Sequence, residues 1–287
     1  MVNGQLSQEL QATFSCMPSI NCKFLNKEEA DLNNFDDIVQ SIESYKPTHI
    51  INAAAYTQVE KAESEEELVN VINAKAVGIM ADQAKKNNAF FFHFSTDYVF
   101  DGAKLSPYVE TDAKAPLNAY GRSKSMGEDY IQQVDGDFFI LRVSWMYGQY
   151  GKNFYKTILN LARTKEQIQV VSDQIGTPTW SHDIAQVMAN LLEKKDLIDK
   201  KGIYHLAPTG EASWYDFSKK IVELYNCYNP KDRLILKEIV PVKTVEYPSL
   251  VQRPLNSRLN CEKIRKNFNI EIASWEICLA AAVKSRI

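Results

Sequence analysis

Two neighbouring stretches decide the fold: A-F-F-F-H-F-S-T-D-Y-V-F-D-G (89–102) and P-L-N-A-Y-G-R-S-K (116–124). The apolar run that opens the first stretch is typical of a strand buried on both faces of a parallel sheet. Ser95 and Thr96 follow at its carboxyl end, which is the edge where open α/β sheets bind ligands. Tyr120 and Lys124 are four residues apart and therefore share one face of a predicted helix.

Thr96, Tyr120 and Lys124 together suggest proton chemistry. A tyrosine phenol has an ordinary pKa of about 10, and a neighbouring ammonium lowers the pKa by favouring the phenolate. The phenol can then exchange a proton with a carbonyl or alcohol oxygen that Thr96 also binds. A Tyr and a Lys at this spacing also occur by chance on surface helices, but the strand end lies 24 residues upstream of Tyr120, as a strand–loop–helix crossover requires.

Seven blocks, spread nearly end to end, resemble the dTDP-4-dehydrorhamnose reductase family of the extended short-chain dehydrogenases/reductases. The resemblance implies NADPH-dependent reduction of the C4 keto group of dTDP-4-dehydro-L-rhamnose to dTDP-L-rhamnose, for cell-surface polysaccharide synthesis. It also implies catalytic roles for Thr96, Tyr120 and Lys124. The blocks are N-G-Q-L (3–6), I-N-A-A-A-Y-T-Q-V-E-K-A-E (51–63), S-T-D-Y-V-F-D-G (95–102), P-L-N-A-Y-G-R-S-K (116–124), L-R-V-S-W-M-Y-G (141–148), S-D-Q-I-G-T-P-T (172–179) and R-P-L-N-S-R-L (253–259).

Two other functions stay open. One is a reductase or epimerase acting on another sugar nucleotide, which the blocks at 51–63 and 253–259 argue against. The other is a non-catalytic regulatory subunit, because the fold also resembles the β subunit of methionine adenosyltransferase. The intact Thr96, Tyr120 and Lys124 favour an enzyme, whereas an incomplete glycine-rich loop favours a binding role.

The resemblance extends to binding residues. Small side chains after a strand let a cofactor pass close to the backbone, although tight packing explains them equally well. The aromatic at 145 is either a sugar-stacking residue or ordinary core, and the guanidinium at 253 either binds a phosphate or anchors a loop. The expected cofactor-binding residues are Gly4, Gln5, Leu6, Asp31, Leu32, Ala53, Ala54, Ala55, Tyr120 and Lys124, and the expected substrate-binding residues are Thr57, Val59, Thr96, Trp145, Asn153 and Arg253.

The glycine-rich turn of a dinucleotide fold is incomplete at the start of this chain. The family has a buried first strand followed by G-x-x-G-x-x-G, whose glycines allow close approach to a pyrophosphate. Here Gly4 matches the middle glycine, Met1 and Ser7 occupy the other two positions, and no strand precedes them. Either the true start lies upstream, or the protein lacks this strand and has a gap in its sheet. Because the loss of a central strand exposes unpaired backbone groups, we expect the first explanation.

The order of predicted elements indicates an α/β fold, with a Rossmann-type doubly wound parallel sheet and a smaller C-terminal α/β substrate lobe. The dinucleotide-binding domain is expected at 1–146, with 175–200 returning to it, and the substrate lobe at 147–174 and 201–287. A second strand is expected at Asn21–Leu25. Asn26 and Lys27 follow where a carboxylate would select NAD, so we expect NADPH, with NADH as the alternative because two glutamates come next.

Composition excludes several functions. With 287 residues and a net charge of −3, the chain has no electrostatic case for nucleic acid or an anionic membrane. Five scattered cysteines and no signal segment or membrane-length apolar run indicate a reduced, cytoplasmic protein. The histidines at 182 and 205 have no partner at metal-ligand spacing, so no metal site is expected. The family resemblance adds Mg²⁺, with no ligands assigned, and a homodimer as further expectations.

Overall fold

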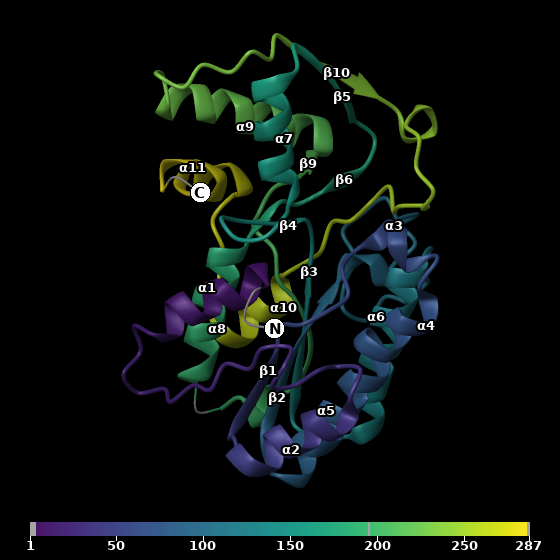
Figure 1. Cartoon of the computed structure of the whole chain (residues 1–287), viewed down its shortest axis with the longest axis vertical. Coiled ribbons are helices and arrows are strands. Elements are labelled where there is room, and N and C mark those ends of the chain that lie inside the picture. The colour runs from purple at the N-terminus through teal and green to yellow at the C-terminus, as the bar shows by residue number, and fades with distance from the viewer. Residues whose placement is uncertain (1–3, 195, 286–287) are drawn as a thin grey trace.

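A four-stranded parallel sheet forms the centre of the larger lobe in this computed structural model, which describes residues 4–194 and 196–285 (Figure 1). Every residue of the second strand is buried, as its apolar sequence predicts. This sheet, with helices on both sides, confirms the expected Rossmann-type α/β class. The strands in spatial order are β1 (His49–Asn52), β2 (Phe90–Thr96), β3 (Phe138–Val143) and β8 (Gly202–His205).

Helices cover both faces of the sheet because successive side chains of a strand point to opposite sides. Phe91 belongs to one hydrophobic cluster, together with residues of the helices α2, α5 and α6. Phe90 and Phe92 belong to the other cluster, together with residues of α1, α8 and α10. The bounds of these helices are α2 (Phe35–Tyr45), α5 (Ala76–Lys86), α6 (Ala119–Val134), α1 (Gln5–Phe14), α8 (Ser181–Leu192) and α10 (Glu262–Phe268).

Short helices lead from the sheet edge to α5. The sequence predicts one helix from Val69 to Lys86, and the structure inserts a π-helical turn, η1 (Val71–Lys75), between α4 (Glu66–Asn70) and α5. A π-turn re-aims side chains within a helix and is frequent at functional sites. Here the turn carries Asn73. The preceding helix is α3 (Val59–Ala62).

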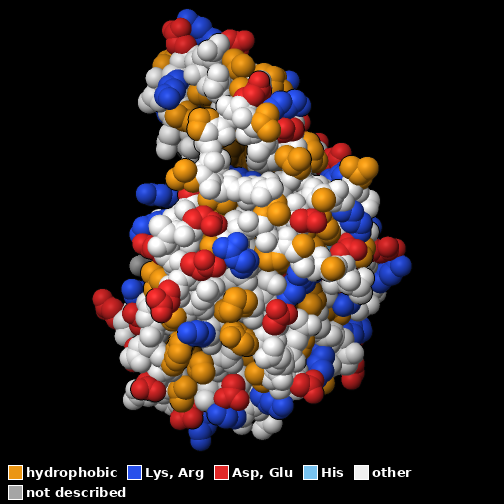
Figure 2. Space-filling model, turned by 90° about the vertical axis from the view of Figure 1, so that its right-hand side faces the viewer, with side chains coloured by type: hydrophobic (Ala, Val, Ile, Leu, Met, Phe, Trp, Pro, Cys, Tyr) orange, Lys and Arg blue, Asp and Glu red, His pale blue; other side chains and the backbone are white. Residues whose placement is uncertain are grey.

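The smaller lobe is built from short strands and three helices, and it occupies the upper part of Figure 1. Figure 2 shows a hollowed surface where this narrow lobe meets the broad one. Its elements are β4 (Met146–Tyr147), α7 (Phe154–Thr164), β5 (Gln167–Val171), β6 (Ile175–Gly176), β7 (Thr179–Trp180), β9 (Ala212–Ser213), α9 (Trp214–Tyr228), β10 (Glu238–Val242), the 3₁₀ turn η4 (Thr244–Glu246) and α11 (Trp275–Lys284). The 3₁₀ turns η2 (Asp97–Val99) and η3 (Ile198–Lys200) belong to the large lobe.

Part of the expected substrate lobe lies in the main sheet instead. Gly202–His205, which the sequence analysis assigned to the smaller lobe, pairs in parallel with Phe139–Arg142 of β3 as the fourth strand. The side chains of Tyr204 and His205 are buried there. Packing against β3 and α10 therefore places this segment in the main sheet. Its order along the chain did not indicate this.

The predicted strand Asn21–Leu25 does not form. The segment has no regular secondary structure, and a cavity of about 480 Å³ lies between it and β1. Within the described residues β1 pairs only with β2, so one of its edges faces this cavity. A strand needs a neighbour to satisfy its backbone groups, and no strand of the described part of the chain lies beside residues 21–25. Met1, the expected position of the first glycine, lies outside the described residues.

Among the described residues, no helix combines the length and the apolar character needed to cross a membrane.

Candidate active site

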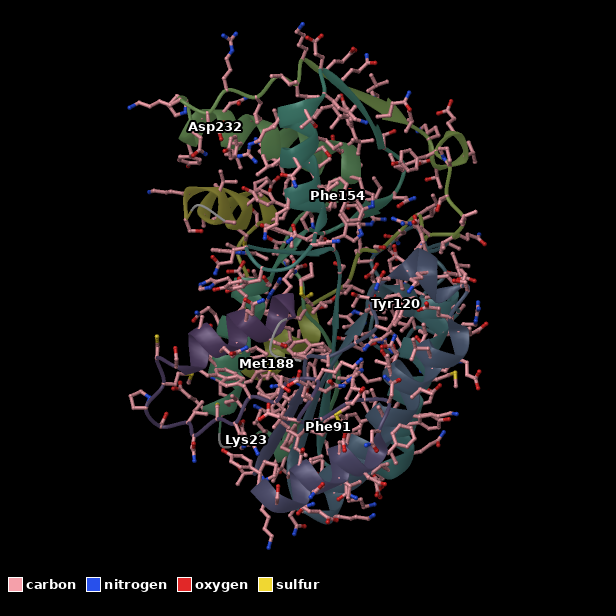
Figure 3. All side chains as sticks on the ribbon, viewed as in Figure 1. Lys23, Phe91, Tyr120, Phe154, Met188 and Asp232 are labelled. Atoms are coloured by element: carbon pink, nitrogen blue, oxygen red, sulfur yellow. The ribbon has the colours of Figure 1, made fainter. Side chains whose placement is uncertain are left out.

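Tyr120 lies at the end of the large lobe that faces the smaller one (Figure 3). Thr96 ends β2, and Tyr120 is the second residue of α6. The Asn118 side chain starts this helix by accepting a hydrogen bond from the Gly121 amide at 2.9 Å. A Cβ on Gly121 would lie 2.3 Å from the Tyr98 carbonyl oxygen, so only glycine allows α6 to begin this close to η2. The Thr96 hydroxyl donates to Asp97 Oδ1 at 3.2 Å and lies close enough to the Tyr120 phenol to affect its pKa.

The Tyr120 phenol is held in its protonated form. Burial raises its pKa above the ordinary value, and the nearby Asp97 and Tyr98 raise the pKa further. The Thr96 hydroxyl acts in the opposite direction. The Tyr98 ring contacts the Tyr120 ring edge-on, with 5.6 Å between centroids. A protonated phenol in this position can donate a proton to a ligand oxygen.

Lys124 does not act on Tyr120 as the sequence predicted. Its side chain is buried, and its Nζ donates to the Phe94 carbonyl at 2.7 Å and lies 2.9 Å from His93 Nε2. Burial lowers the pKa of Lys124 to about 7, with Glu128 acting in the opposite direction. The expected lowering of the Tyr120 pKa by an ammonium is therefore absent in this structure. The cause is desolvation, which the spacing of the two residues does not reveal.

Asp97 is a site residue that the sequence analysis missed. Its carboxyl group is buried, and burial raises its pKa to about 6 although hydrogen bonds with Ser257 and Thr96 oppose the shift. Its Oδ2 atom has no hydrogen-bond partner among the described residues. An acidic residue directly after Thr96, at the carboxyl end of a buried strand, was the available signal.

A buried ion pair fixes α6 to the sheet. Arg142 of β3 binds Glu128 of α6 through both carboxylate oxygens, at 2.9 and 2.7 Å. Ser95 donates to the same carboxylate at 2.5 Å, and Lys114 lies 3.6 Å from it. A bidentate pair of this kind has a defined geometry. The pair therefore determines where the first turn of α6, with Tyr120, lies relative to the end of β2.

Asn73 ties the loop after β1 to α6. Its Oδ1 accepts from the Tyr56 amide at 2.8 Å, and its Nδ2 donates to the Tyr56 carbonyl and to the Ser123 hydroxyl, both at 3.0 Å. Ser123 lies between Tyr120 and Lys124 on the helix. The family resemblance places an Asn near the active centre, and here its contacts are structural ones.

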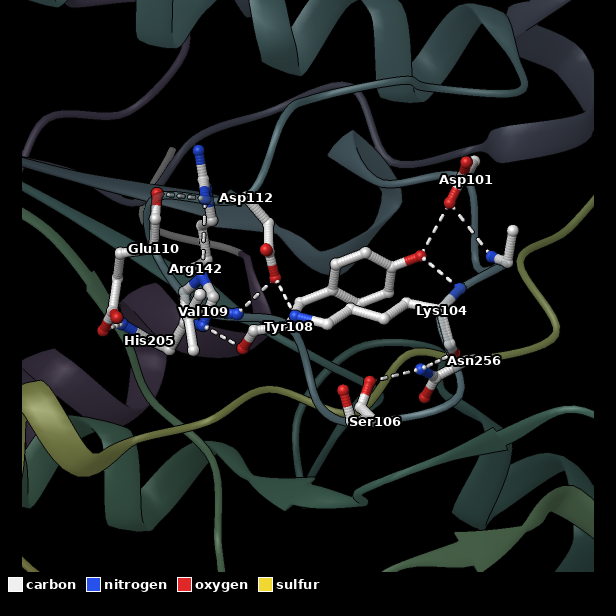
Figure 4. A network of polar contacts seen from close by, with 11 residues as sticks. Asp101, Lys104, Ser106, Tyr108, Val109, Glu110, Asp112, Arg142, His205 and Asn256 are labelled. Carbon is white, nitrogen blue, oxygen red and sulfur yellow. Dashed lines mark hydrogen bonds and ion pairs between the residues drawn. The ribbon is translucent and has the colours of Figure 1, made fainter.

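The loop at 101–112 is fastened to the segment at 253–259 by the polar network in Figure 4. Tyr108 donates to Asp101 at 2.6 Å, and Lys104 binds Asp112 at 2.5 Å. Asn256 donates to the carbonyl oxygens of Lys104 and Ser106, at 2.6 and 2.9 Å. The segment at 253–259 is thereby held beside the loop that follows η2.

Three of the expected substrate residues come from two separate segments: Thr57 and Val59 follow β1, and Arg253 belongs to the segment at 253–259. Arg253 donates to Glu60 at 3.0 Å, which is the ion pair anticipated as the alternative to phosphate binding. Thr57 is exposed, and Val59 begins α3.

Trp145 is held by another aromatic ring. Its indole stacks on Trp214 with 3.6 Å between centroids, and a Cβ on Gly176 would lie 2.5 Å from its ring. Its φ of +45° is in the left-handed region, which is uncommon for a bulky residue. The packing around the indole therefore overrides its backbone preference, and strain of this kind clusters at functional sites.

The structure brings Asn153 and Gln5 together, although the sequence assigned them to different ligands. The Asn153 Nδ2 donates to Gln5 Oε1 at 2.8 Å and to the Gly148 carbonyl at 2.7 Å. Its Oδ1 caps α7 by accepting from the Lys156 amide at 3.1 Å. This side chain thus joins the start of α1 to the start of α7.

The expected cofactor residues divide into two groups. Leu32, Ala53 and Ala54 line the cavity beside β1, whereas Leu6 packs in the core of the large lobe. Ala55 is half-buried and is not part of the cavity lining. Gly4 is the N-cap residue of α1, and having no side chain it leaves the amides at the start of this helix without a side-chain partner from the cap. The Asp31 carboxylate accepts from Asn33 and lies 3.7 Å from Lys27.

No group of three or more His, Cys, Asp or Glu residues within 4–194 and 196–285 is arranged to hold a metal ion. The Mg²⁺ that the family resemblance added gains no support from these residues.

The chain matches the family described as RmlD substrate binding domain over residues 2–286. It is 38% identical over 287 residues to a dTDP-4-dehydrorhamnose reductase of Burkholderia thailandensis, an alignment that covers 98% of this chain and 96% of the relative. A solved dTDP-4-dehydrorhamnose reductase of Bacillus anthracis, in complex with NADP, is 36% identical with a TM-score of 0.88, covering 98% of this chain and 95% of that one. A Clostridium acetobutylicum ortholog has a TM-score of 0.91 at 31% identity, covering 99% and 96%.

Proposed function

The chain belongs to the RmlD substrate binding domain family, and from this premise we propose that it is an NADPH-dependent dTDP-4-dehydrorhamnose reductase. Its substrate is dTDP-4-dehydro-L-rhamnose, whose C4 keto group it reduces for polysaccharide synthesis. The observation that carries the proposal is the placement of the Tyr120 phenol, whose pKa burial raises, beside Thr96 at the end of β2. The Bacillus anthracis relative binds NADP, which favours NADPH over NADH.

Several features of the structure fit a dinucleotide. The first turn of α1 has no acidic residue, and Gly4 places no side chain over the N-terminus of this helix, where an anion is favoured. Ala53 and Ala54 border the cavity beside β1 with small side chains. The pyrophosphate would contact the backbone of Gly4, Gln5 and Leu6. The Leu6 side chain is not available to it, because it packs in the hydrophobic core. Asp31, Leu32 and Ala55 complete the proposed adenosine side.

The substrate would lie between the lobes. Thr57, Val59 and Arg253 approach the site from the large lobe and from the segment fastened to it. Trp145 and Asn153 belong to the smaller lobe and its junction. Arg253 is the residue suited to a diphosphate, since a guanidinium binds phosphate oxygens in a bidentate manner.

The chemistry of the chain's own residues is proton donation to an oxygen. NADPH, when bound, supplies the hydride. Thr96 and Tyr120 hydrogen-bond the C4 oxygen, and Tyr120 Oη gives it a proton as negative charge develops. Burial keeps the phenol protonated until that charge appears, and Lys124 in its charged form would then lower the pKa of the phenol and bind ribose hydroxyls.

A cytoplasmic location fits the cysteines. Cys16, Cys22 and Cys227 are exposed and unpaired, and free exposed thiols persist in a reducing compartment.

The test is the oxidation of NADPH in the presence of dTDP-4-dehydro-L-rhamnose. Tyr120→Phe removes the proton donor, so kcat should fall by about 10²- to 10⁴-fold while NADPH still binds. Tyr130→Phe removes the hydroxyl of another tyrosine on α6 and should leave kcat unchanged. Binding of NADPH measured by calorimetry completes the test.

Two outcomes would contradict the proposal. A full-length chain that does not bind NADPH is not a reductase of this kind. Unchanged turnover in Tyr120→Phe would remove Tyr120 from its proposed role, even if the enzyme reduced the sugar.

A further inference from the structure

A directed chain of hydrogen bonds ends on Lys124, and none of the proposed catalytic steps uses its other members. Asn52 is the last residue of β1, and His93 is its register partner on β2. Lys124 reaches both strands from α6. Asn52, His93 and Lys124 are all buried, with relative exposures of 5%, 0% and 1%. Groups so completely removed from water must satisfy each other, so the direction of each hydrogen bond can be worked out.

The direction is set by a backbone amide. The Ala54 N–H donates to Asn52 Oδ1 at 3.0 Å, which fixes the orientation of the Asn52 amide because a backbone N–H can only donate. Asn52 Nδ2 therefore faces His93 Nδ1, at 3.1 Å, and donates to it. His93 Nδ1 is thus an acceptor.

His93 then has a single available form. With Nδ1 accepting, the neutral imidazole carries its proton on Nε2, and a doubly protonated ring would place two donors face to face at Asn52. Burial and the neighbouring Lys124 also lower the pKa of His93 well below its ordinary value. The Nε2–H consequently donates to Lys124 Nζ over 2.9 Å.

An ammonium cannot accept this hydrogen bond. Lys124 must offer a lone pair to His93, while one of its own N–H groups donates to the Phe94 carbonyl. Geometry therefore requires the uncharged amine, in agreement with the pKa of about 7. The charged group that acts on Lys124 from α6 is Glu128, and that carboxylate is already paired with Arg142.

We propose that His93 is a positioning residue that holds Lys124 as an uncharged amine in the resting protein, and that Lys124 takes up one proton from solvent when the nicotinamide cofactor binds. The second half rests on the proposed function, in which a charged Lys124 binds the ribose. The first half is a property of the unliganded chain. The only covalent change is the N–H bond formed with the added proton. The resulting ammonium can no longer accept from His93 Nε2–H, so that hydrogen bond is lost when Lys124 is protonated.

The first half is tested by NMR of the full chain labelled with ¹⁵N-histidine. The chain has four histidines, and His93→Gln identifies the His93 signals by their loss. We expect the Nε2–H form of His93 between pH 8 and 9, where Lys124 is uncharged. An Nδ1–H form, or titration of the ring within this range, would overturn the proposal.

The second half is tested by calorimetry of NADPH binding at pH 8 in buffers that differ in ionisation enthalpy. We expect uptake of about 0.9 proton per chain, since a group with a pKa of about 7 is about nine-tenths uncharged there. Lys124→Met removes the titrating group and should reduce the uptake to nearly zero. His49→Gln changes another histidine near the start of β1 and should keep the wild-type uptake.

Two variants test the direction of the chain. His93→Gln preserves it, because the Gln oxygen accepts from Asn52 and its amide donates to Lys124, so uptake should persist. Asn52→Asp reverses it: the new carboxylate accepts a hydrogen bond from His93 Nδ1–H, Nε2 becomes an acceptor, and Lys124 is charged before NADPH arrives. Uptake should then vanish.

The two proposals fail in different ways. If NADPH does not bind, the reductase proposal fails and the NMR result alone decides the state of His93. If NADPH binds with no proton uptake by the wild type, the reductase survives and the proposed change of Lys124 is overturned. If uptake persists in Asn52→Asp, the proposed direction of the chain is overturned.

Discussion

Lys124 was identified from its spacing to Tyr120, but its chemistry depends on residues that the spacing does not involve. A sequence gives the lysine an ordinary pKa above 10. Burial on α6, with His93 and the Phe94 carbonyl as partners, lowers that pKa to about 7. His93 carries no local signal, because a histidine inside an apolar strand is usually structural. Its role becomes visible only when β1, β2 and α6 are assembled.

The uncharged state of Lys124 predicts how the stability of the unliganded protein depends on pH. Its pKa is lower in the folded state than in the unfolded chain, so from about pH 7 to 8.5 the unfolded chain binds more protons, by about half a proton at pH 7 and nearly one at pH 8.5. Stability therefore rises with pH in this window, by up to about 1.4 kcal/mol per pH unit, and is lost as the pH falls towards 7. Below that value both states are protonated, and the dependence ends.

Urea denaturation at several pH values checks this prediction. The difference in unfolding free energy between wild type and Lys124→Met isolates the lysine, because other titrating groups contribute equally to both proteins. A difference that stays constant from pH 7 to 8.5 would show that Lys124 keeps its charge in the folded state.

At the scale of elements, the strand–loop–helix unit from β2 to α6 was predictable and the neighbourhood of Asn21–Leu25 was not. The apolar run before Ser95 and the four-residue spacing of Tyr120 and Lys124 are local signals, and the structure has both elements. Asn21–Leu25 has the composition of a strand, but a strand also requires a partner. The nearest strand in the described part of the chain is β1, which lies on the other side of the cavity. A sequence pattern reports what a segment can form, and its neighbours decide what it does form.

The Arg142–Glu128 pair leads to a prediction about α6. Arg142→Met leaves the Glu128 carboxylate buried with its main partner removed, which typically costs about 3–5 kcal/mol of unfolding free energy. Arg122→Met is the matched control, because Arg122 pairs with Glu66 at 3.1 Å on the exposed side of the same helix. Such a surface pair contributes about 0–1 kcal/mol. Equal losses in the two variants, measured by urea denaturation, would show that the buried pair does not anchor α6.

At the scale of the whole molecule, residues from distant parts of the sequence form the junction between the lobes. The resemblance of the R-P-L-N-S block to its family indicated a binding segment, but not what would hold it. Asn256 fastens this segment to the loop after η2, and Arg253 reaches Glu60 on α3. These contacts span more than 140 residues of sequence, so only the folded chain shows them.

The Arg253–Glu60 pair predicts a change in substrate affinity. If Arg253 binds the diphosphate of the substrate, Glu60 competes for the same guanidinium. Glu60→Gln should then lower the KM for dTDP-4-dehydro-L-rhamnose by roughly two- to fivefold with kcat unchanged, because an exposed pair of this kind contributes about 0.2–1 kcal/mol. Glu211→Gln is the matched control, since Glu211 is similarly exposed and pairs with Arg258 at 2.7 Å, outside the proposed substrate residues. A raised KM in Glu60→Gln would instead mean that the ion pair positions Arg253, and an unchanged KM would place Arg253 away from the diphosphate.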